Sequence, residues 1–383
     1  MTPFSVYVHI PYCDSKCPYC DFNSYAAKRW PEAAYVEALR AELRGAAERP
    51  EWSTGVVQTI FFGGGTPSLF AAASIGCVLD TVRDLWVTVQ PEIEVSLEAN
   101  PGTVDAVKLQ AIRAVGVNRI SFGVQSFDPR HLASLGRIHS AEQAISAIGS
   151  ARLAGFENLS FDLMFAVPEQ TPEDWEADLN TALALAPDHI SAYNLTYEEG
   201  TAFHAQRRNG TLAPVVEEDE LAMFTRTRTR LAEHGYAAYE ISNFARTGRE
   251  CAHNLNYWRA GAYLGIGAGA HSFARLPAPG SRWSNERSPR RYIERVAADG
   301  HARVSEERLS ATQARGEFAF LGLRCTEGVA ADAFADRFGV DFDSAFPHAE
   351  ALCRDGMLER VDGRWRLTAR GLLFADSVFA TFM

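Results

Sequence analysis

The stretch of sequence that decides the fold reads FSVYVHIPYCDSKCPYC and covers residues 4–20. Its first part, Phe4–Ile10, is rich in β-branched and aromatic side chains, which is typical of a β-strand. The remainder places Cys13, Cys17 and Cys20 at the spacing C-x3-C-x2-C. Cysteine is the usual ligand of iron–sulfur clusters, so three thiolates on one short loop can hold three corners of a cubane cluster. The fourth iron would stay open for a small molecule that binds through an amine and a carboxylate, as a catalytic metal keeps one position open.

A structural zinc site is the main alternative for these cysteines. Zinc in such sites takes four ligands, usually as two closely spaced pairs. The only further candidate nearby is His9, and strand alternation alone does not show that its side chain faces the loop. The spacing therefore favours the cluster, while zinc or an incidental grouping of cysteines stays as an alternative.

The chain up to about residue 200 alternates strand-like runs with helix-like runs. The strand-like runs are Phe4–Ile10, Val57–Phe62, Ile93–Leu97, Arg119–Val124, Leu159–Phe165 and His189–Leu195. Helical periodicity lies near residues 31–48, 69–86, 104–115, 141–154 and 172–185. Repeated βα units predict a parallel sheet with right-handed crossovers. The fold class is therefore α/β, with either a barrel or a doubly wound sheet.

Polar or glycine-rich residues stand at the C-terminal ends of the predicted strands. They are the cysteine loop, Gly63–Pro67, Glu98–Pro101, Gln125, Asp162 and Tyr193–Tyr197. Barrels build their sites at this face from several strands, whereas an open sheet concentrates its site at one or two loops. We therefore expect a partial, TIM-like (β/α)6 barrel.

The βα pattern fades after residue 200. We expect a helix near 217–234, an irregular stretch from Asn243 to Phe273 and a linker at 275–280, where prolines and a glycine cluster. The predicted domains are therefore a barrel at residues 1–275 and a smaller, mainly helical domain at residues 285–383.

The C-terminal domain ends in two strand-like runs around Asp362-Gly363, which is a hairpin signal. A helical unit with such an end resembles a winged helix. Residues 305–383 carry 9 arginines and no lysine against 13 acidic residues, a net charge of −4. This charge favours a packing or partner-binding role over DNA binding.

Composition narrows the class of protein further. The net charge of −11 disfavours nucleic-acid partners. No apolar run approaches the ~18 residues of a membrane span, which leaves only peripheral contact with a membrane. The first residues lack the pattern of a secretory signal, and seven cysteines, an odd number, argue against a disulfide framework. We expect a cytoplasmic protein.

Four motifs in this order resemble the radical S-adenosylmethionine (SAM) superfamily and, more narrowly, the anaerobic coproporphyrinogen III oxidase family. They are YVHIPYC at 7–13, GGGTP at 63–67, SFGVQSF at 121–127 and the strand with Asp162. The likeness runs from residue 4 into the C-terminal domain. It implies that Cys13, Cys17 and Cys20 ligate a [4Fe-4S] cluster whose open iron binds SAM. In such proteins the reduced cluster cleaves SAM to a 5′-deoxyadenosyl radical.

The resemblance also implies which residues contact SAM. They are Tyr7, Gly64, Gly65, Thr66, Glu98, Gln125, Arg137 and Asp162. Glu98 matches a position that pairs with the ribose or the amino group of SAM. Taken singly, Gln125, Arg137 and Asp162 would be read as surface or capping residues, so their weight comes from occurring together.

Two departures separate the chain from the oxidases of this family. Phe22 stands where those oxidases carry a fourth cysteine, and only 12 residues precede Cys13 where they have an extended segment. Both features match a sister branch, the HemW-type heme chaperones, which also carry an H-N-x-x-Y-W motif. Here that motif is residues 253–258.

The motif suggests a heme ligand because a neutral imidazole commonly ligates heme iron. The resemblance thus implies heme binding through His253, with Tyr257 and Trp258 against the porphyrin. In the alternative, His253 only hydrogen-bonds a loop and the two aromatic side chains pack beneath it. His271 is a secondary candidate.

Three functions remain in view. The resemblance favours a heme chaperone that hands heme to an acceptor protein and receives electrons from a donor. The first alternative is an oxygen-independent coproporphyrinogen III dehydrogenase, which both departures disfavour, so that activity as an enzyme beyond SAM cleavage is left open. The second is a zinc-stabilised scaffold without redox chemistry.

Overall fold

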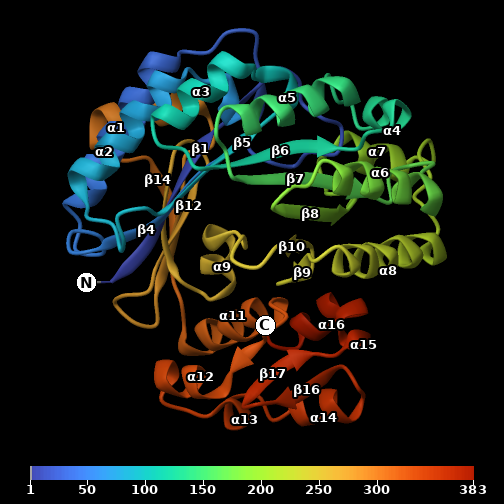
Figure 1. Ribbon diagram of the computed structural model, residues 1–383. Helices are drawn as coiled ribbons and strands as arrows, with labels where there is room; N and C mark the ends of the chain where they lie inside the picture. The colour runs from blue at the N-terminus through green and yellow to red at the C-terminus, as the bar shows by residue number, and fades with distance from the viewer. Residues whose placement is uncertain (1) are drawn as a thin grey trace.

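A large curved sheet forms the main body of the computed structural model, which describes residues 2–383 (Figure 1). Its central strands are β1 (Pro3–Ile10), β4 (Val56–Gly64), β5 (Glu94–Ala99), β6 (Arg119–Gln125), β7 (Asn158–Phe165) and β8 (His189–Asn194). They lie side by side in this order and pair in parallel. The six predicted strands and the parallel sheet are thus confirmed.

Helices cover the outer face of this sheet (Figure 1). They are α1 (Glu32–Ala47), α2 (Ala72–Leu85), α3 (Ala106–Ala114), α5 (Ala141–Leu153) and α6 (Pro172–Ala184), which confirms the predicted crossovers. Ser140 and Thr171 begin the last two with capping boxes, in which the side chain accepts a hydrogen bond from the third backbone N–H.

Further strands extend the sheet at both edges. On one side β11 (Ala262–Ile266) pairs in parallel with β1, followed by the antiparallel strands β12 (His271–Ala274), β13 (Ser281–Asn285) and β14 (Arg303–Arg308). On the other side β10 (Asn243–Ala245) and β9 (Ala237–Ala238) follow β8. The 12-stranded sheet curves but does not close, so the fold is a partial barrel.

Two expectations for residues 243–280 are wrong. The stretch expected to be irregular contains β10, β11, most of β12 and helix α9 (Ala252–Trp258). The segment 275–280, expected to be a linker, instead joins β12 to β13 in the same sheet. Helix α10 (Pro289–Asp299) packs against α1. We therefore propose that the barrel unit extends to about residue 308.

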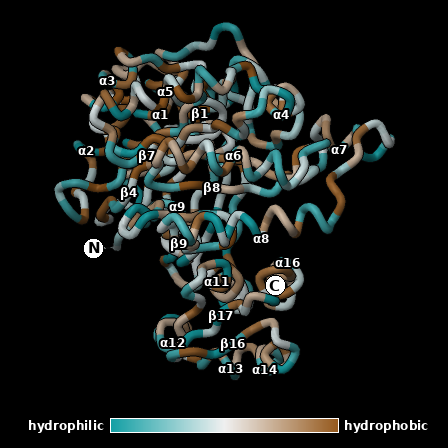
Figure 2. The backbone as a smooth tube through the Cα atoms, turned by 45° about the vertical axis from the view of Figure 1, so that its right-hand side comes forward, coloured by the Kyte–Doolittle hydropathy of each residue, from teal (hydrophilic) through white to brown (hydrophobic). Residues whose placement is uncertain are grey.

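The C-terminal unit has its own core and lies below the large sheet (Figure 2). Its helices are α11 (Ala311–Arg324), α12 (Ala331–Phe338), α13 (Phe342–Ala345), α14 (Ala349–Arg354), α15 (Ala369–Leu373) and α16 (Ala375–Ala380). The predicted hairpin is confirmed as β16 (Leu358–Val361) and β17 (Arg364–Leu367), and β15 (Val329–Ala330) adds a third strand. Phe334, Phe342 and Trp365 are buried at its centre.

Five further elements connect or flank these units. They are β2 (Tyr12–Cys13), β3 (Tyr25–Ala26), α4 (Pro129–Ser134), α7 (Ala202–Arg208) and α8 (Glu217–Glu233). Helix α8 confirms the prediction for 217–234. No helix within residues 2–383 is long and apolar enough to cross a membrane.

Candidate cofactor site

The three clustered cysteines lie on the loop after β1. Each is a free thiol and partly buried. Cys13 ends the short strand β2, which pairs with β3, and the backbone N–H of Cys20 donates to the carbonyl of Cys17 at 3.2 Å. Because β2–β3 pairing closes the loop at its base, the thiols are held together at the mouth of the barrel.

The glycine-rich loop after β4 packs directly on the cysteine loop. The N–H of Gly65 donates to the carbonyl of Ile10 at 2.7 Å, and that of Thr66 donates to the carbonyl of Tyr12 at 2.8 Å. A Cβ on Gly65 would lie 2.6 Å from the Tyr12 carbonyl oxygen, and Gly64 has a φ of 114°. Glycine is therefore required at these positions for the two loops to contact each other, whether or not a ligand binds there.

Carboxylates from β5 and β7 meet beneath these loops. Oε2 of Glu98 accepts a hydrogen bond from the N–H of Gly64 at 3.1 Å. Burial, together with the nearby charge of Asp162, raises the pKa of Glu98 to about 8. Burial also raises the pKa of Asp162, although the hydroxyl of Ser121 donates to both of its oxygens at 3.1 and 3.2 Å. Both carboxyls thus sit where a cationic ligand would stabilise their ionised forms.

Gln125 and Arg137 frame the other side of the site. Gln125 ends β6 with a φ of 69°, which is unusual for a residue with a side chain, at a shift in the register between β6 and β7. Arg137 donates from Nη2 to the carbonyl of Gly123 at 2.7 Å and from Nη1 to Sγ of Cys17 at 3.6 Å. Its Nε is buried and has no partner among residues 2–383. This N–H is a donor that the protein itself leaves without an acceptor.

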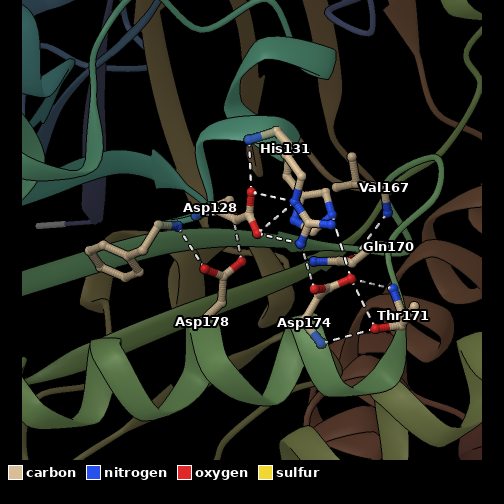
Figure 3. Close-up of polar contacts among 10 residues, drawn as sticks. Asp128, His131, Val167, Gln170, Thr171, Asp174 and Asp178 are labelled. Carbon is tan, nitrogen blue, oxygen red and sulfur yellow. Dashed lines mark hydrogen bonds and ion pairs between the residues drawn. The ribbon is translucent and has the colours of Figure 1, made fainter.

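A polar network fixes the loop between Gln125 and helix α4 (Figure 3). Asp178 of α6 accepts from the hydroxyl of Ser126 at 2.6 Å and from the N–H of Phe127 at 2.7 Å. Arg130 then joins Asp128 on this loop to Asp174 on α6, at 2.7 Å to each. Helix α6 therefore anchors the segment that follows β6.

One cavity of about 970 Å³ brings the predicted residues together, and we call it the cofactor cavity. It is lined by Cys13, Cys17, Cys20, Gly64, Gly65, Thr66, Glu98, Gln125, Arg137 and Asp162. Its volume lies at the upper end of the ~300–1,000 Å³ typical of ligand pockets. Tyr7 is the one predicted SAM contact outside its lining; its hydroxyl bonds Nδ1 of His9 at 3.1 Å and it lines a second cavity.

The donor set fits a cluster better than a single metal ion. Within residues 2–383, no three His, Cys, Asp or Glu side chains converge closely enough to hold one ion. A cubane cluster instead binds each thiolate through a different iron, so its sulfurs are more widely spaced than zinc ligands. The arrangement gives no support to the zinc alternative.

Comparison with known proteins agrees with this geometry. The model of the Radical SAM superfamily matches residues 7–182, and that of the HemN C-terminal domain matches residues 309–374. Heme chaperone HemW of Bacillus subtilis is 36% identical over 99% of both chains, and that of Escherichia coli is 37% identical over 100% of this chain and 99% of its own. The chain belongs to the HemW family.

The chain is also similar to a mouse protein and to a solved structure. The mouse protein "Radical S-adenosyl methionine domain-containing protein 1, mitochondrial" is 36% identical over 100% of this chain and 88% of its own. Among solved structures, coproporphyrinogen III oxidase (HemN) from Escherichia coli matches with a TM-score of 0.85 at 25% identity, over 100% of this chain and 90% of that one. Phe22, predicted as a departure from the oxidases, is 62% exposed at the edge of the cofactor cavity.

The HemW-type motif at 253–258 lies on α9, where His253 and Asn256 are buried and the other motif residues are partly buried. His253 is 1% exposed; its Nδ1 lies 2.8 Å from Oγ1 of Thr59 and its Nε2 lies 2.9 Å from the hydroxyl of Tyr257. Burial and the nearby Arg119 lower its pKa to about 3, so the ring is neutral. Thr59 of β4 and Tyr257 of α9 thus engage both ring nitrogens, so neither nitrogen is free for heme iron in this arrangement.

Several residues of the cofactor cavity carried no signal in the sequence. Phe224 of α8, Ile241 before β10, and Leu373 and Phe374 of the C-terminal unit all line it. These residues belong to no sequence motif, and only tertiary packing brings them to the barrel mouth. Tyr193 had a weak signal, because it follows the pattern of polar residues at strand ends.

Proposed function

We propose that this chain is a heme chaperone that binds heme and delivers it to an acceptor protein. The observation that carries the proposal is the 36–38% identity to heme chaperones HemW over 99–100% of the chain. Phe22 in place of a fourth cysteine supports the same reading over porphyrinogen oxidation. The acceptor is a heme-free hemoprotein, and a separate reductant supplies electrons.

The cofactor cavity would hold a [4Fe-4S] cluster on Cys13, Cys17 and Cys20, with SAM at the open iron. When reduced, such a cluster supplies the electron that cleaves a carbon–sulfur bond of SAM. The protein's part is to bind and orient. Glu98 and Asp162 offer carboxylates to the cationic ligand, while Arg137 offers the unpaired N–H at Nε. A cytoplasmic location is part of the proposal, supported by seven free cysteines.

Oxidation of coproporphyrinogen III is the second candidate, because the HemN structure shares the fold at a TM-score of 0.85. The two candidates separate in one pair of assays on anaerobically reconstituted protein. We expect saturable uptake of heme and no conversion of coproporphyrinogen III to protoporphyrinogen IX in the presence of SAM and a reductant. Steady conversion without heme uptake would replace the chaperone by the oxidase.

A further inference from the structure

The second cavity lies beside the cofactor cavity and has a volume of about 710 Å³. Phe22, Gly64 and Glu98 line both cavities, so the two adjoin at the barrel mouth. Its volume falls within the ~300–1,000 Å³ typical of ligand pockets. The predicted SAM contacts Tyr7, Gly64 and Glu98 line its border with the SAM site, and the rest of its lining lies outside that site.

Aromatic and aliphatic side chains form most of its wall. Tyr257 and Trp258 come from α9, Tyr263 and Phe273 come from β11 and β12, and Leu309 precedes α11. Such rings offer flat faces on which a planar aromatic ligand can stack. The cavity therefore suits a large, flat and largely apolar molecule.

Two cations of this cavity lack an acidic partner. Neither Arg287 nor Arg337 forms an ion pair within residues 2–383, whereas Arg282 is bound by Glu307 at 2.7 Å and by Glu317 at 2.6 Å. Arg337 donates only to the carbonyl of Ala260, at 3.1 Å. Guanidinium groups pair well with carboxylates. The cavity thus combines apolar walls with two cations ready for an acidic ligand.

Two of the cavity's histidines differ in what their rings contact. His9 is engaged at both nitrogens, by the hydroxyl of Tyr7 at 3.1 Å and the carbonyl of Asn23 at 2.9 Å. His271, at the start of β12, is exposed, and no hydrogen bond joins its ring to another residue of 2–383. An imidazole that faces a cavity with free nitrogens can ligate a metal without breaking any contact of the fold.

We propose that the second cavity is the heme site, with His271 as an axial ligand of the iron and with Arg287 and Arg337 facing the propionates. The inference rests on the proposed heme chaperone function and moves the ligand from His253 to His271. It also places heme next to the SAM site, with Phe22 on the wall between them.

The test is a titration of the reconstituted protein with ferric heme, followed by absorption and electron paramagnetic resonance spectra. His271→Ala should change the iron spectrum and weaken binding by about tenfold or more. His271→Met should bind heme with a new spectrum, because it exchanges one ligand for another. His253→Gln and His234→Ala should bind as the unaltered protein does; His234 is an exposed histidine on the end of α8, away from the cavity.

A second arm tests the arginines. Heme dimethyl ester lacks free propionates, so Arg287→Glu should weaken the binding of heme by about tenfold and leave that of the ester unchanged. If wild-type protein binds heme but His271→Ala keeps both affinity and spectrum, or if His253→Gln alone loses the heme spectrum while still folded, the site is wrong. If wild-type protein takes up no heme, the proposed function itself fails.

Discussion

At the scale of single residues, backbone geometry decides where the side chains that line the cofactor cavity lie. Gly65 must lack a side chain for the loop after β4 to bond the cysteine loop, and Gln125 must take a positive φ at the end of β6. These two constraints place the thiols of one loop opposite the polar side chains of the others. The site is thus specified by close contact between loops that are far apart in the sequence.

The clustered thiols differ from the other cysteines in what they can bind, and this gives the first prediction. Cys17→Ser should abolish the cluster. Only two thiolates would remain, and the cluster is stable in the protein only while its thiolate ligands hold it. Cys77→Ser is the matched control, since Cys77 is an exposed thiol on α2. Iron and sulfide analysis after anaerobic reconstitution measures the result. A Cys17→Ser protein with an unchanged iron content would contradict the assignment.

The raised pKa of Glu98 predicts that the stability of the apoprotein depends on pH. Its native pKa is about 8, above its ordinary value of 4.5, because of burial and the charge of Asp162. Between these pH values the native apoprotein binds more protons than the unfolded chain, so the free energy of unfolding should fall as pH rises through this window. Urea unfolding at pH 6 and pH 8 should show that Glu98→Gln flattens this fall, whereas Glu157→Gln on the surface leaves it intact. If the free energy of unfolding changed equally with pH in all three proteins, the raised pKa of Glu98 would be refuted.

At the scale of elements, helix α6 holds the loop after β6 in place. Asp178 is 2% exposed, and its carboxylate is the acceptor for both Ser126 and Phe127. Since Gln125 directly precedes this pair, the position of a cofactor-cavity residue depends on a helix behind the sheet.

Replacing Asp178 by alanine should therefore affect both stability and binding. The buried hydroxyl of Ser126 and the partly buried N–H of Phe127 lose their acceptor, and a buried group left without a partner costs about 1–3 kcal/mol of stability. We expect a lower free energy of unfolding in urea and weaker SAM binding, while Glu173→Ala on the exposed side of α6 changes neither by much. Normal SAM affinity in a destabilised Asp178→Ala protein would show that the network supports only the fold.

The elements differed in how far the sequence could predict them. The six central strands and their helices were predictable because their hydrophobic periodicity is local and strong. The edge strands β9 to β14 were missed or misread since most are short and pair with segments remote in the sequence, as β11 does with β1. The prolines at 277 and 279 looked like a linker, yet hairpin loops use the same residues.

At the scale of the whole molecule, ion pairs join the two units, and one of them involves a fully buried carboxylate. Nε of Arg324 on α11 lies 2.7 Å from Oε2 of Glu240, which precedes β10 and is fully buried. The guanidinium also stacks on Trp258, at 4.5 Å from the ring centre. The C-terminal unit is thus fixed to the barrel beside both cavities.

Removal of this cation should loosen the contact between the units. Arg324→Ala leaves a buried carboxylate without its partner, and the loss should approach but not reach the ~3–5 kcal/mol of a fully buried pair because Arg324 is 27% exposed. Calorimetry should then show the C-terminal unit melting before the barrel. The exposed pair Arg360–Asp343 is the control, and Arg360→Ala should cost about 0–1 kcal/mol. A single unshifted transition for Arg324→Ala would contradict this role.

Sequence motifs predicted the residues of the cofactor cavity, but not the direction in which the side chains of the motif at 253–258 point. The cysteine loop and the residues at strand ends line one cavity because parallel strands end at the same edge of the sheet, so their pattern transfers directly to the structure. The pattern at 253–258 does not encode which side of α9 faces inward, and packing buries His253 against Thr59 and Tyr257. The contributions of Leu373 and Phe374 depend on the docking of a separate unit, which no local pattern describes.

The central claim is that one chain holds a SAM-binding cluster and heme at the same time, in two adjoining cavities. The most direct measurement is heme titration of anaerobically reconstituted protein, with non-heme iron and sulfide determined on the same sample. The account predicts one heme bound per chain while about four irons and four sulfides of the cluster are retained. Loss of the cluster as heme binds, or the absence of saturable heme binding, would contradict it.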